Sequence, residues 1–160
     1  MKLAILNYCG TVGKTTLAAH LFKPRMPDAP IMAIESINDD VSSLGLDSEK
    51  FKGDKYMQIY KRLLVQDDCI IDVGASNVEN FLDRMIKFDG SHEEIDLFVV
   101  PVTPGQKEQR ESAATIASLI EIGVPVEKIR VILNRVEDEP KAEFVTIFGA
   151  AKKFGFKLSE

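Results

Sequence analysis

A glycine-rich turn near the N-terminus carries the residues whose types and spacing could do chemistry. Gly10 and Gly13 lie in this turn, and Lys14 and Thr15 follow where an apolar run gives way to a helical pattern. Backbone N–H groups at the start of a helix attract anions, and glycine lets the chain wrap closely around a phosphate. The lysine could reach the β- and γ-phosphates of a nucleotide, and the threonine hydroxyl could ligate Mg²⁺. The segment predicts a phosphate-binding loop, although Tyr8 stands where the strict pattern requires glycine.

Two acidic residues close apolar runs where a magnesium-nucleotide site needs a carboxylate. We predict that Asp72 holds Mg²⁺ together with Thr15. Glu35 stands at the carboxyl end of another run, the edge at which α/β sheets assemble their sites, and could place an attacking water. Asp39 and Asp40, in the segment that follows, are rivals for that role. The alternative that these are ordinary strand-end charges stays open, for Glu35 above all.

The elements that would position these residues follow an α/β pattern. Short runs rich in Ile and Val alternate with amphipathic stretches, which is typical of a parallel sheet covered by helices. We predict a three-layer αβα sandwich with a mainly parallel five-stranded sheet, strand order 2-3-1-4-5 and the first strand central. The expected strands cover 2–7, 31–35, 69–73, 97–102 and 129–133. The expected helices run from residue 14 until Pro24 stops the first, and over 55–65, 107–122 and 141–154; segments 38–53 and 89–94 are expected to be loops.

Composition excludes several classes of protein. The 160 residues leave room for one domain, and 45% hydrophobic residues suffice for a core. The net charge of −5 argues against a general affinity for nucleic acid, so direct DNA contact should be weak or absent. Cys9 and Cys69 lack metal-ligand spacing. No apolar run reaches the ~18 residues of a membrane span, and no signal peptide or amphipathic tail is evident, so we expect a cytoplasmic protein without a membrane anchor.

Five motifs in this order resemble those of the ParA/MinD family of deviant P-loop ATPases. They are Gly10 to Thr16, Ile34-Glu35, Ile70-Ile71-Asp72, Val99 to Pro104, and Leu133 to Val136. Within the family, the opening from Leu6 to Thr16 and the later Pro24-Arg25-Met26 look most like plasmid-stability proteins of the StbB type. The resemblance covers residues 2–136 and is weaker over 37–67.

This resemblance implies an ATP- and Mg²⁺-dependent switch that acts in plasmid stability, partition or conjugative transfer. Family members bind ATP, often form a nucleotide-dependent homodimer, and work with a DNA-binding adaptor protein, so we expect these partners here. The positions that match imply catalytic roles for Lys14, Glu35 and Asp72, and a metal held by Thr15 and Asp72. They imply a nucleotide site formed by Gly10, Thr11, Val12, Gly13, Lys14, Thr15, Thr16, Asn134 and Arg135, with Asn134 at the adenine edge.

Position 9 departs from the family, which has there a lysine that reaches the partner's phosphates in the dimer. Cys9 supplies no such charge, and a lost cation in comparable sites lowers the rate by roughly 10³- to 10⁵-fold. We therefore expect ATP binding with slow or partner-stimulated hydrolysis.

Three other interpretations stay open. In a GTP-binding switch, Glu137 would read guanine; the chain could also be a scaffold that binds nucleotide without hydrolysing it, or, with less support, a small-molecule kinase. The apolar run 156–158 could be a frayed tail or the start of a further strand whose remainder is absent.

Overall fold

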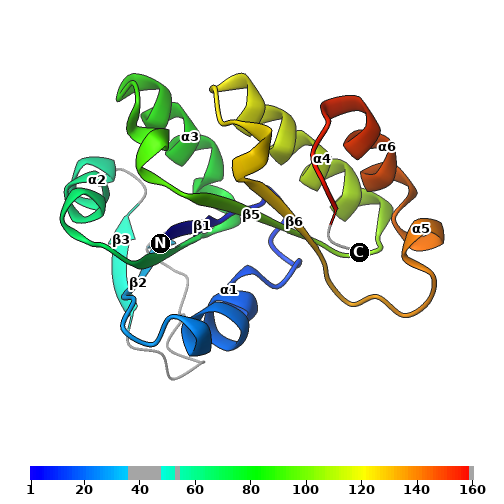
Figure 1. The fold of residues 1–160 in the computed structure, drawn as a ribbon, viewed down its shortest axis with the longest axis horizontal. Helices are drawn as coiled ribbons and strands as arrows, with labels where there is room; N and C mark the ends of the chain where they lie inside the picture. The colour runs from blue at the N-terminus through cyan, green and yellow to red at the C-terminus, as the bar shows by residue number, and fades with distance from the viewer. Residues whose placement is uncertain (36–47, 53–54, 159–160) are drawn as a thin grey trace.

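The computed structural model describes residues 1–35, 48–52 and 55–158. Within these residues, six parallel strands form one sheet in the order β3-β2-β4-β1-β5-β6 (Figure 1). The strands are β1 Lys2–Ile5, β2 Ile31–Glu35, β3 Ser48–Lys52, β4 Cys69–Val73, β5 Leu97–Val102 and β6 Ile129–Leu133. The predicted fold class, the order of the five predicted strands and the inner place of β1 are confirmed.

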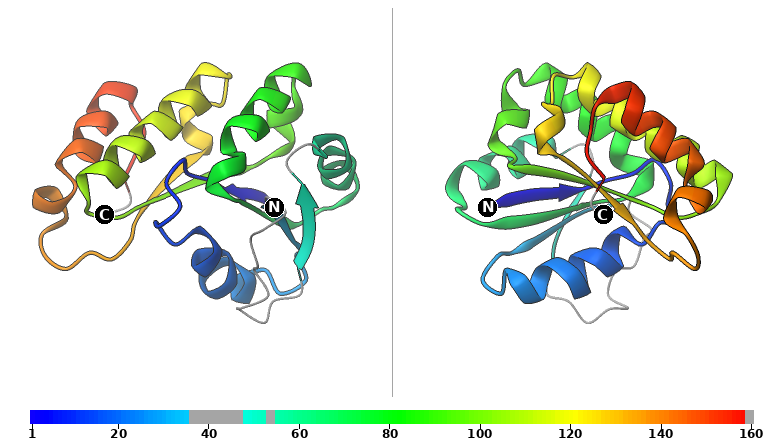
Figure 2. Two further views of the ribbon diagram at one scale, coloured as in Figure 1. Left: turned by 180° about the vertical axis from the view of Figure 1, so that it is seen from behind. Right: turned by 45° about the vertical axis from the view of Figure 1, so that its right-hand side comes forward.

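Helices cover both faces of the sheet. One face carries the segment after β1, in which α1 Lys14–Leu17 continues as a π-helix, Ala18–Phe22, and a 3₁₀ turn, Lys23–Arg25. The opposite face carries the longer helices (Figure 2). These are α2 Tyr56–Val65, α3 Val78–Lys87, α4 Gln106–Glu121 and α6 Val145–Phe154, with the short α5 Pro140–Glu143 before α6. In the described part of the chain, no helix combines the length and apolar character needed to cross a membrane.

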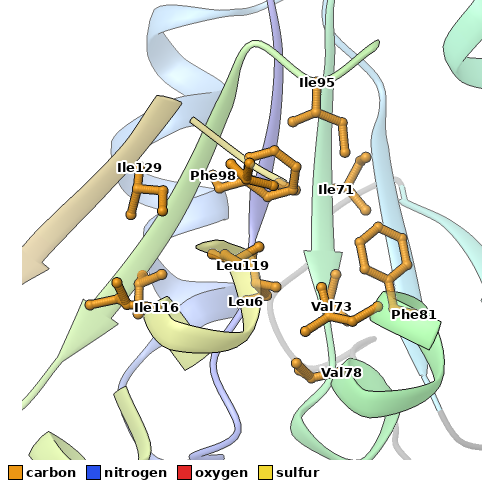
Figure 3. Packing of buried hydrophobic residues seen from close by; sticks show 14 of the residues in the cluster. Leu6, Ile71, Val73, Val78, Phe81, Ile95, Phe98, Ile116, Leu119 and Ile129 are labelled. Carbon is orange, nitrogen blue, oxygen red and sulfur yellow. The ribbon is translucent and has the colours of Figure 1, made fainter. Parts of the chain in front are cut away.

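The alternation of side chains along the buried strands divides the core into two hydrophobic clusters. Leu3 and Ile5 of β1 point to the smaller cluster, under α1, whereas Ala4 points to the larger one. In the larger cluster, Phe81 of α3 and Leu119 of α4 lie over the strands (Figure 3). Because the inner strands are covered on both faces, their continuous apolar sequences form strands without polar alternation.

Two elements differ from the expected ones because their stability comes from tertiary pairing. β3 lies inside the segment expected to be a loop; its sequence is polar, and it is an edge strand that pairs in parallel with β2. The expected helix over 141–154 breaks at the buried Phe144 (φ −110°). The side chain of Gln109 holds this break, since it donates to the carbonyl of Glu143 (2.7 Å) and accepts from the backbone N–H of Thr146 (3.1 Å).

Smaller corrections concern element ends and one omitted helix. Helix α3 was not expected, although Val78, Phe81, Leu82 and Met85 share one face and are buried. β1 ends at Ile5 rather than at residue 7, Pro24 lies within a 3₁₀ turn instead of stopping the helix before it, and residues 91–94 of the expected second loop form a 3₁₀ turn. Leu158 forms a single parallel bridge to Val131.

Candidate nucleotide-binding site

A cavity of about 560 Å³ lies at the carboxyl edge of the sheet, beside the loop between β1 and α1. The ends of several strands contribute to it, since the last residue of β2 and residues after β4 and β6 converge there with the loop. Its lining includes Gly10, Thr11, Gly13, Lys14, Thr15, Thr16, Glu35, Gly74, Ala75, Ser76 and Arg135. The structure thus brings together eight of the eleven predicted site residues around one cavity. The other three, Val12, Asp72 and Asn134, lie directly behind this lining and contact it.

The loop turns sharply at Gly13, where φ is +88° and ψ is +30°. The carbonyl of Gly13 accepts the first helical hydrogen bond from the N–H of Leu17 (3.0 Å). Just before it, the carbonyl of Val12 accepts from the side-chain Nδ2 of Asn134 at the end of β6 (3.0 Å). Glycine is needed here for two reasons, because φ is positive and because an added Cβ would lie 2.8 Å from that same Nδ2.

A Gly13→Ala variant should therefore lose stability and bind nucleotide poorly. The positive φ and the displaced Asn134 side chain together should lower the free energy of unfolding by about 1 to 3 kcal/mol, measured by urea denaturation. Gly149→Ala is the matched control, because Gly149 lies within α6 with open space around its Cα. This change should be neutral or raise stability by about 0.5 to 1 kcal/mol. Equal losses in the two variants would contradict the strained turn at Gly13.

The first half of the loop is anchored on β5 and α4 by residues that sequence reasoning missed. The buried Asn7 donates from Nδ2 to the carbonyl of Pro101 and to the hydroxyl of Ser112, and its Oδ1 accepts from the N–H of Cys9, all at 2.7 Å. The N–H of Tyr8 donates to the hydroxyl of Thr115 (3.1 Å). Ser112 and Thr115 are three residues apart in α4 and therefore share a helix face, and this spacing was the signal that the sequence offered.

Lys14 is held within this loop. Its side chain is only 5% exposed, and Nζ donates to the carbonyls of Cys9 (2.7 Å) and Asn7 (3.3 Å). Burial lowers the pKa of Lys14, while the nearby Asp72 carboxyl and the Cys9 side chain act in the opposite direction. An anion in the cavity would stabilise the protonated amine that burial disfavours, because opposite charges attract strongly at a desolvated site.

Asp72 lies behind Thr15 at the end of β4. It is 4% exposed, and burial raises the pKa of its carboxyl, against the lowering effects of the Thr15 hydroxyl and of Lys14. Its Oδ1 is buried and makes no hydrogen bond to any described residue. A buried acceptor beside a hydroxyl fits Mg²⁺, which prefers oxygen ligands. The described residues contain no group of three His, Cys, Asp or Glu that could hold a metal by itself, so a metal here would also need phosphate oxygens.

Glu35 ends β2 and lines the cavity, so its predicted role has the required location. The N–H of Gly74 donates to the carbonyl of Ile34 (2.8 Å) and thereby joins the ends of β4 and β2. Asp39 and Asp40, the rivals of Glu35 for placing the water, lie outside the described residues.

Asn134 and Arg135 connect β6 to the cavity in different ways. The Asn134 carboxamide donates to Val12 and accepts from the N–H of Arg135 (3.0 Å), so both of its polar groups bond within the protein. Its assignment to the adenine edge stays a prediction. Arg135 is exposed and has φ +58°, and it is the one described residue other than glycine with positive φ. Such a backbone costs about 1 to 2 kcal/mol in a residue with a Cβ.

A second cavity of about 490 Å³ adjoins the first, and both are lined by Thr11 and Arg135. The predicted guanine reader Glu137 lines the second cavity, as do Thr103 and Pro104 at the end of β5. The two cavities together therefore offer room for a phosphate chain beside the loop and for a base next to it.

Neither cysteine presents its thiol to the cavity. Cys9 is 5% exposed, and its Sγ lies 3.4 Å from the hydroxyl of Thr11. Cys69 is fully buried, and this burial raises the pKa of its thiol to about 11.

Comparison with known proteins places this geometry in a structural class. No known family model matches the chain, and no curated protein matches its sequence. Among solved structures, the MinD cell division protein of Aquifex aeolicus matches with a TM-score of 0.55 and 15% identity, over 98% of this chain and 79% of that one. The chain therefore has the fold of this MinD protein.

Two structures of McdA from Cyanothece support the same assignment of fold. The apo form matches with a TM-score of 0.57 and 16% identity, over 99% of this chain and 84% of that one. A complex of ATP with a single-residue variant of McdA matches with a TM-score of 0.57 and 15% identity, over 98% and 80% of the two chains.

Proposed function

We propose that this chain is a nucleotide-dependent switch of the ParA/MinD family that binds ATP with Mg²⁺ and hydrolyses it slowly unless a partner stimulates it. The observation that carries the proposal is the cavity at the loop, where the buried Lys14 and Thr15 begin α1 and Asp72 of β4 lies beside the Thr15 hydroxyl. The McdA-ATP complex, which shares the fold, supports ATP as the ligand.

Each residue has a role in this proposal that follows from its place. The loop N–H groups and Lys14 bind the phosphates, and the Thr15 hydroxyl and the Asp72 carboxylate would hold Mg²⁺. When bound, this ion would neutralise charge that develops on the phosphate oxygens. Glu35 orients a water at the γ-phosphate. Arg135, which lines the cavity, contributes a second cation and so supplies charge that Cys9 lacks.

The biological setting that we propose is plasmid stability, partition or conjugative transfer, together with a DNA-binding adaptor protein. This setting rests on the similarity of the opening motif to StbB-type proteins. A MinC:MinD complex from Aquifex aeolicus, with a TM-score of 0.56 and 14% identity, supports the idea that this fold works with protein partners. A nucleotide-dependent homodimer is part of the same proposal.

One alternative has an observation in its favour. Glu137 lines the cavity next to the phosphate loop, where a carboxylate could accept from the two guanine nitrogens. GTP is therefore the second candidate nucleotide.

Thermal unfolding with ATP and GTP, each with and without Mg²⁺, tests the proposal. ATP with Mg²⁺ should raise the free energy of unfolding by about 2.7 kcal/mol at a hundredfold excess over Kd, whereas GTP should raise it less. Phosphate release, measured in parallel, should be slow. No stabilisation by either nucleotide would overturn the proposal, and a larger effect of GTP would favour the second candidate. Stabilisation without any phosphate release would instead favour a scaffold.

A further inference from the structure

A groove of about 420 Å³ runs between α3 and α4, on the face of the sheet opposite α1. The two helices lie side by side on this face (Figures 1 and 2). The groove differs from the nucleotide cavity in both lining and location, because it follows the outer helices instead of the carboxyl edge of the sheet. We call it the α3–α4 groove and define it by its apolar lining, Tyr8, Leu82, Met85, Ile86 and Ile122, and its acidic rim, Glu79, Asp83, Asp89 and Glu121.

The apolar part of the α3–α4 groove is accessible from outside. Leu82 and Met85 are buried and form its base, whereas Ile86, one turn along α3, is 59% exposed. Ile122 stands on the opposite wall at the end of α4 and is partly buried. An exposed isoleucine beside other apolar side chains in a hollow offers contact area to an apolar group of another molecule.

The rim of the α3–α4 groove has one sign of charge. Its four carboxylates make no ion pair or hydrogen bond with the described residues. Glu79 and Asp83 are four residues apart on α3, a spacing at which like charges repel each other. His92 is the one histidine, lysine or arginine among the residues that line the groove. The carboxylates that line the groove therefore favour cationic groups over nucleic acid or anionic lipid.

We infer that the α3–α4 groove is a docking surface for a short basic amphipathic segment of a partner protein. The apolar side chains of that segment cover Ile86 and Ile122, and its lysines or arginines meet the four carboxylates. This occupant satisfies both properties of the groove at once. A second copy of this chain satisfies the charge less well, because its net charge is −5.

Tyr8 connects the α3–α4 groove to the phosphate loop. Its ring lines the groove, its hydroxyl donates to Ser118 of α4 (3.0 Å), and its backbone belongs to the loop. The next residue, Cys9, accepts the 2.7 Å hydrogen bond from Lys14 Nζ. A segment that moves Tyr8 would thus shift the carbonyl that holds Lys14, and nucleotide in the cavity would act on the groove in return, because coupling between sites is reciprocal. This coupling rests on the proposed function; the docking surface does not.

Fluorescence anisotropy with a defined peptide tests the surface without nucleotide. The probe is a labelled twelve-residue helix of leucine and lysine, with leucines on one face, compared with a scrambled peptide of the same composition and with one in which glutamate replaces lysine. We expect the amphipathic lysine peptide to bind at micromolar concentration and the other two to bind at least tenfold more weakly. Equal binding of the scrambled or the glutamate peptide would overturn the inference.

Charge reversal locates the binding surface. The double variant Asp83→Lys, Glu121→Lys should weaken peptide binding at least tenfold, and Ile86→Ala should weaken it severalfold. The matched control is Asp28→Lys, Glu127→Lys, which changes the net charge equally at exposed positions outside the groove. Circular dichroism establishes that all variants are folded. Equal weakening in the control would show attraction by bulk charge only and would overturn the inference, as would full binding by the groove variants.

The coupling has its own readout. In the wild type, saturating ATP and Mg²⁺ should change the affinity of the lysine peptide about fivefold or more, the lower range for coupled sites. Tyr8→Phe, which removes the hydroxyl that bonds Ser118, should reduce this change while thermal unfolding still reports nucleotide binding. An unchanged peptide affinity in a wild-type protein that ATP does stabilise would overturn the coupling. If ATP does not stabilise the wild type, the proposed function fails, and the peptide titration without nucleotide still decides the docking surface.

Discussion

In a Lys14→Ala variant, we expect ATP with Mg²⁺ to have almost no effect on thermal unfolding. Lys14 Nζ stands at the cavity, fixed by the carbonyls of Cys9 and Asn7, so its removal takes away the main cation of the proposed phosphate site. The wild type should gain about 2.7 kcal/mol at a hundredfold excess of ATP over Kd, and the variant close to nothing. The empty protein should lose some stability with the two hydrogen bonds of Lys14, and this loss is partly offset because burial lowers the pKa of Lys14 and so disfavours its charge in the absence of an anion.

Lys23→Ala provides a matched control for that experiment. Lys23 Nζ also donates to two backbone carbonyls, those of Pro27 (2.9 Å) and Ala29 (2.7 Å), but it does not line the cavity. This variant should lose some stability and keep the full response to ATP. Retention of that response by Lys14→Ala would remove the basis of the site assignment, and its loss in both variants would point to a general defect of folding.

The inner part of the sheet could be predicted from sequence because strands that are buried on both faces have continuous apolar sequences. Strands such as Cys69–Val73 are nearly all apolar, and a run of this kind has few other places in an α/β fold. β3 has no such apolar sequence. Its residues, Ser48–Lys52, are mostly polar, and their strand conformation depends on parallel pairing with β2. The break at Phe144 was equally hidden, because Gln109, far away in sequence, satisfies the backbone groups there. α3 is different: its amphipathic pattern was present and could have been recognised.

The site likewise depends partly on local sequence motifs and partly on contacts between residues that are distant in sequence. The glycine-rich loop is a local motif, so Lys14 and Thr15 could be predicted as site residues from their neighbours alone. That Glu35 lies at the same cavity followed from the rule that parallel strands end at one edge. The bonds from Asn7 to Ser112 and from Tyr8 to Thr115 join residues more than 100 positions apart, and no local pattern specifies them.

Arg135 can supply the positive charge that is absent at position 9. Cys9 is buried and its Sγ contacts Thr11, so it supplies no cation to the cavity. Arg135 lines both the cavity beside the loop and its neighbour. Its φ of +58° is a conformation that a residue with a Cβ adopts at a cost, and such strain is concentrated at functional sites. We therefore expect its guanidinium to contribute more to hydrolysis than to folding.

Two substitutions at this position separate charge from backbone strain. Arg135→Ala and Arg135→Gly both remove the guanidinium, so both should slow single-turnover phosphate release by about 10²- to 10³-fold, the usual effect of losing one group that stabilises transition-state charge. Only Arg135→Gly also relieves the positive φ, so urea denaturation should find it about 1 kcal/mol more stable than Arg135→Ala. Undiminished phosphate release in both variants would place the functional cation elsewhere. Equal stability of the two would mean that the backbone at 135 relaxes when the side chain is lost, and the strained conformation would then owe its existence to the arginine itself.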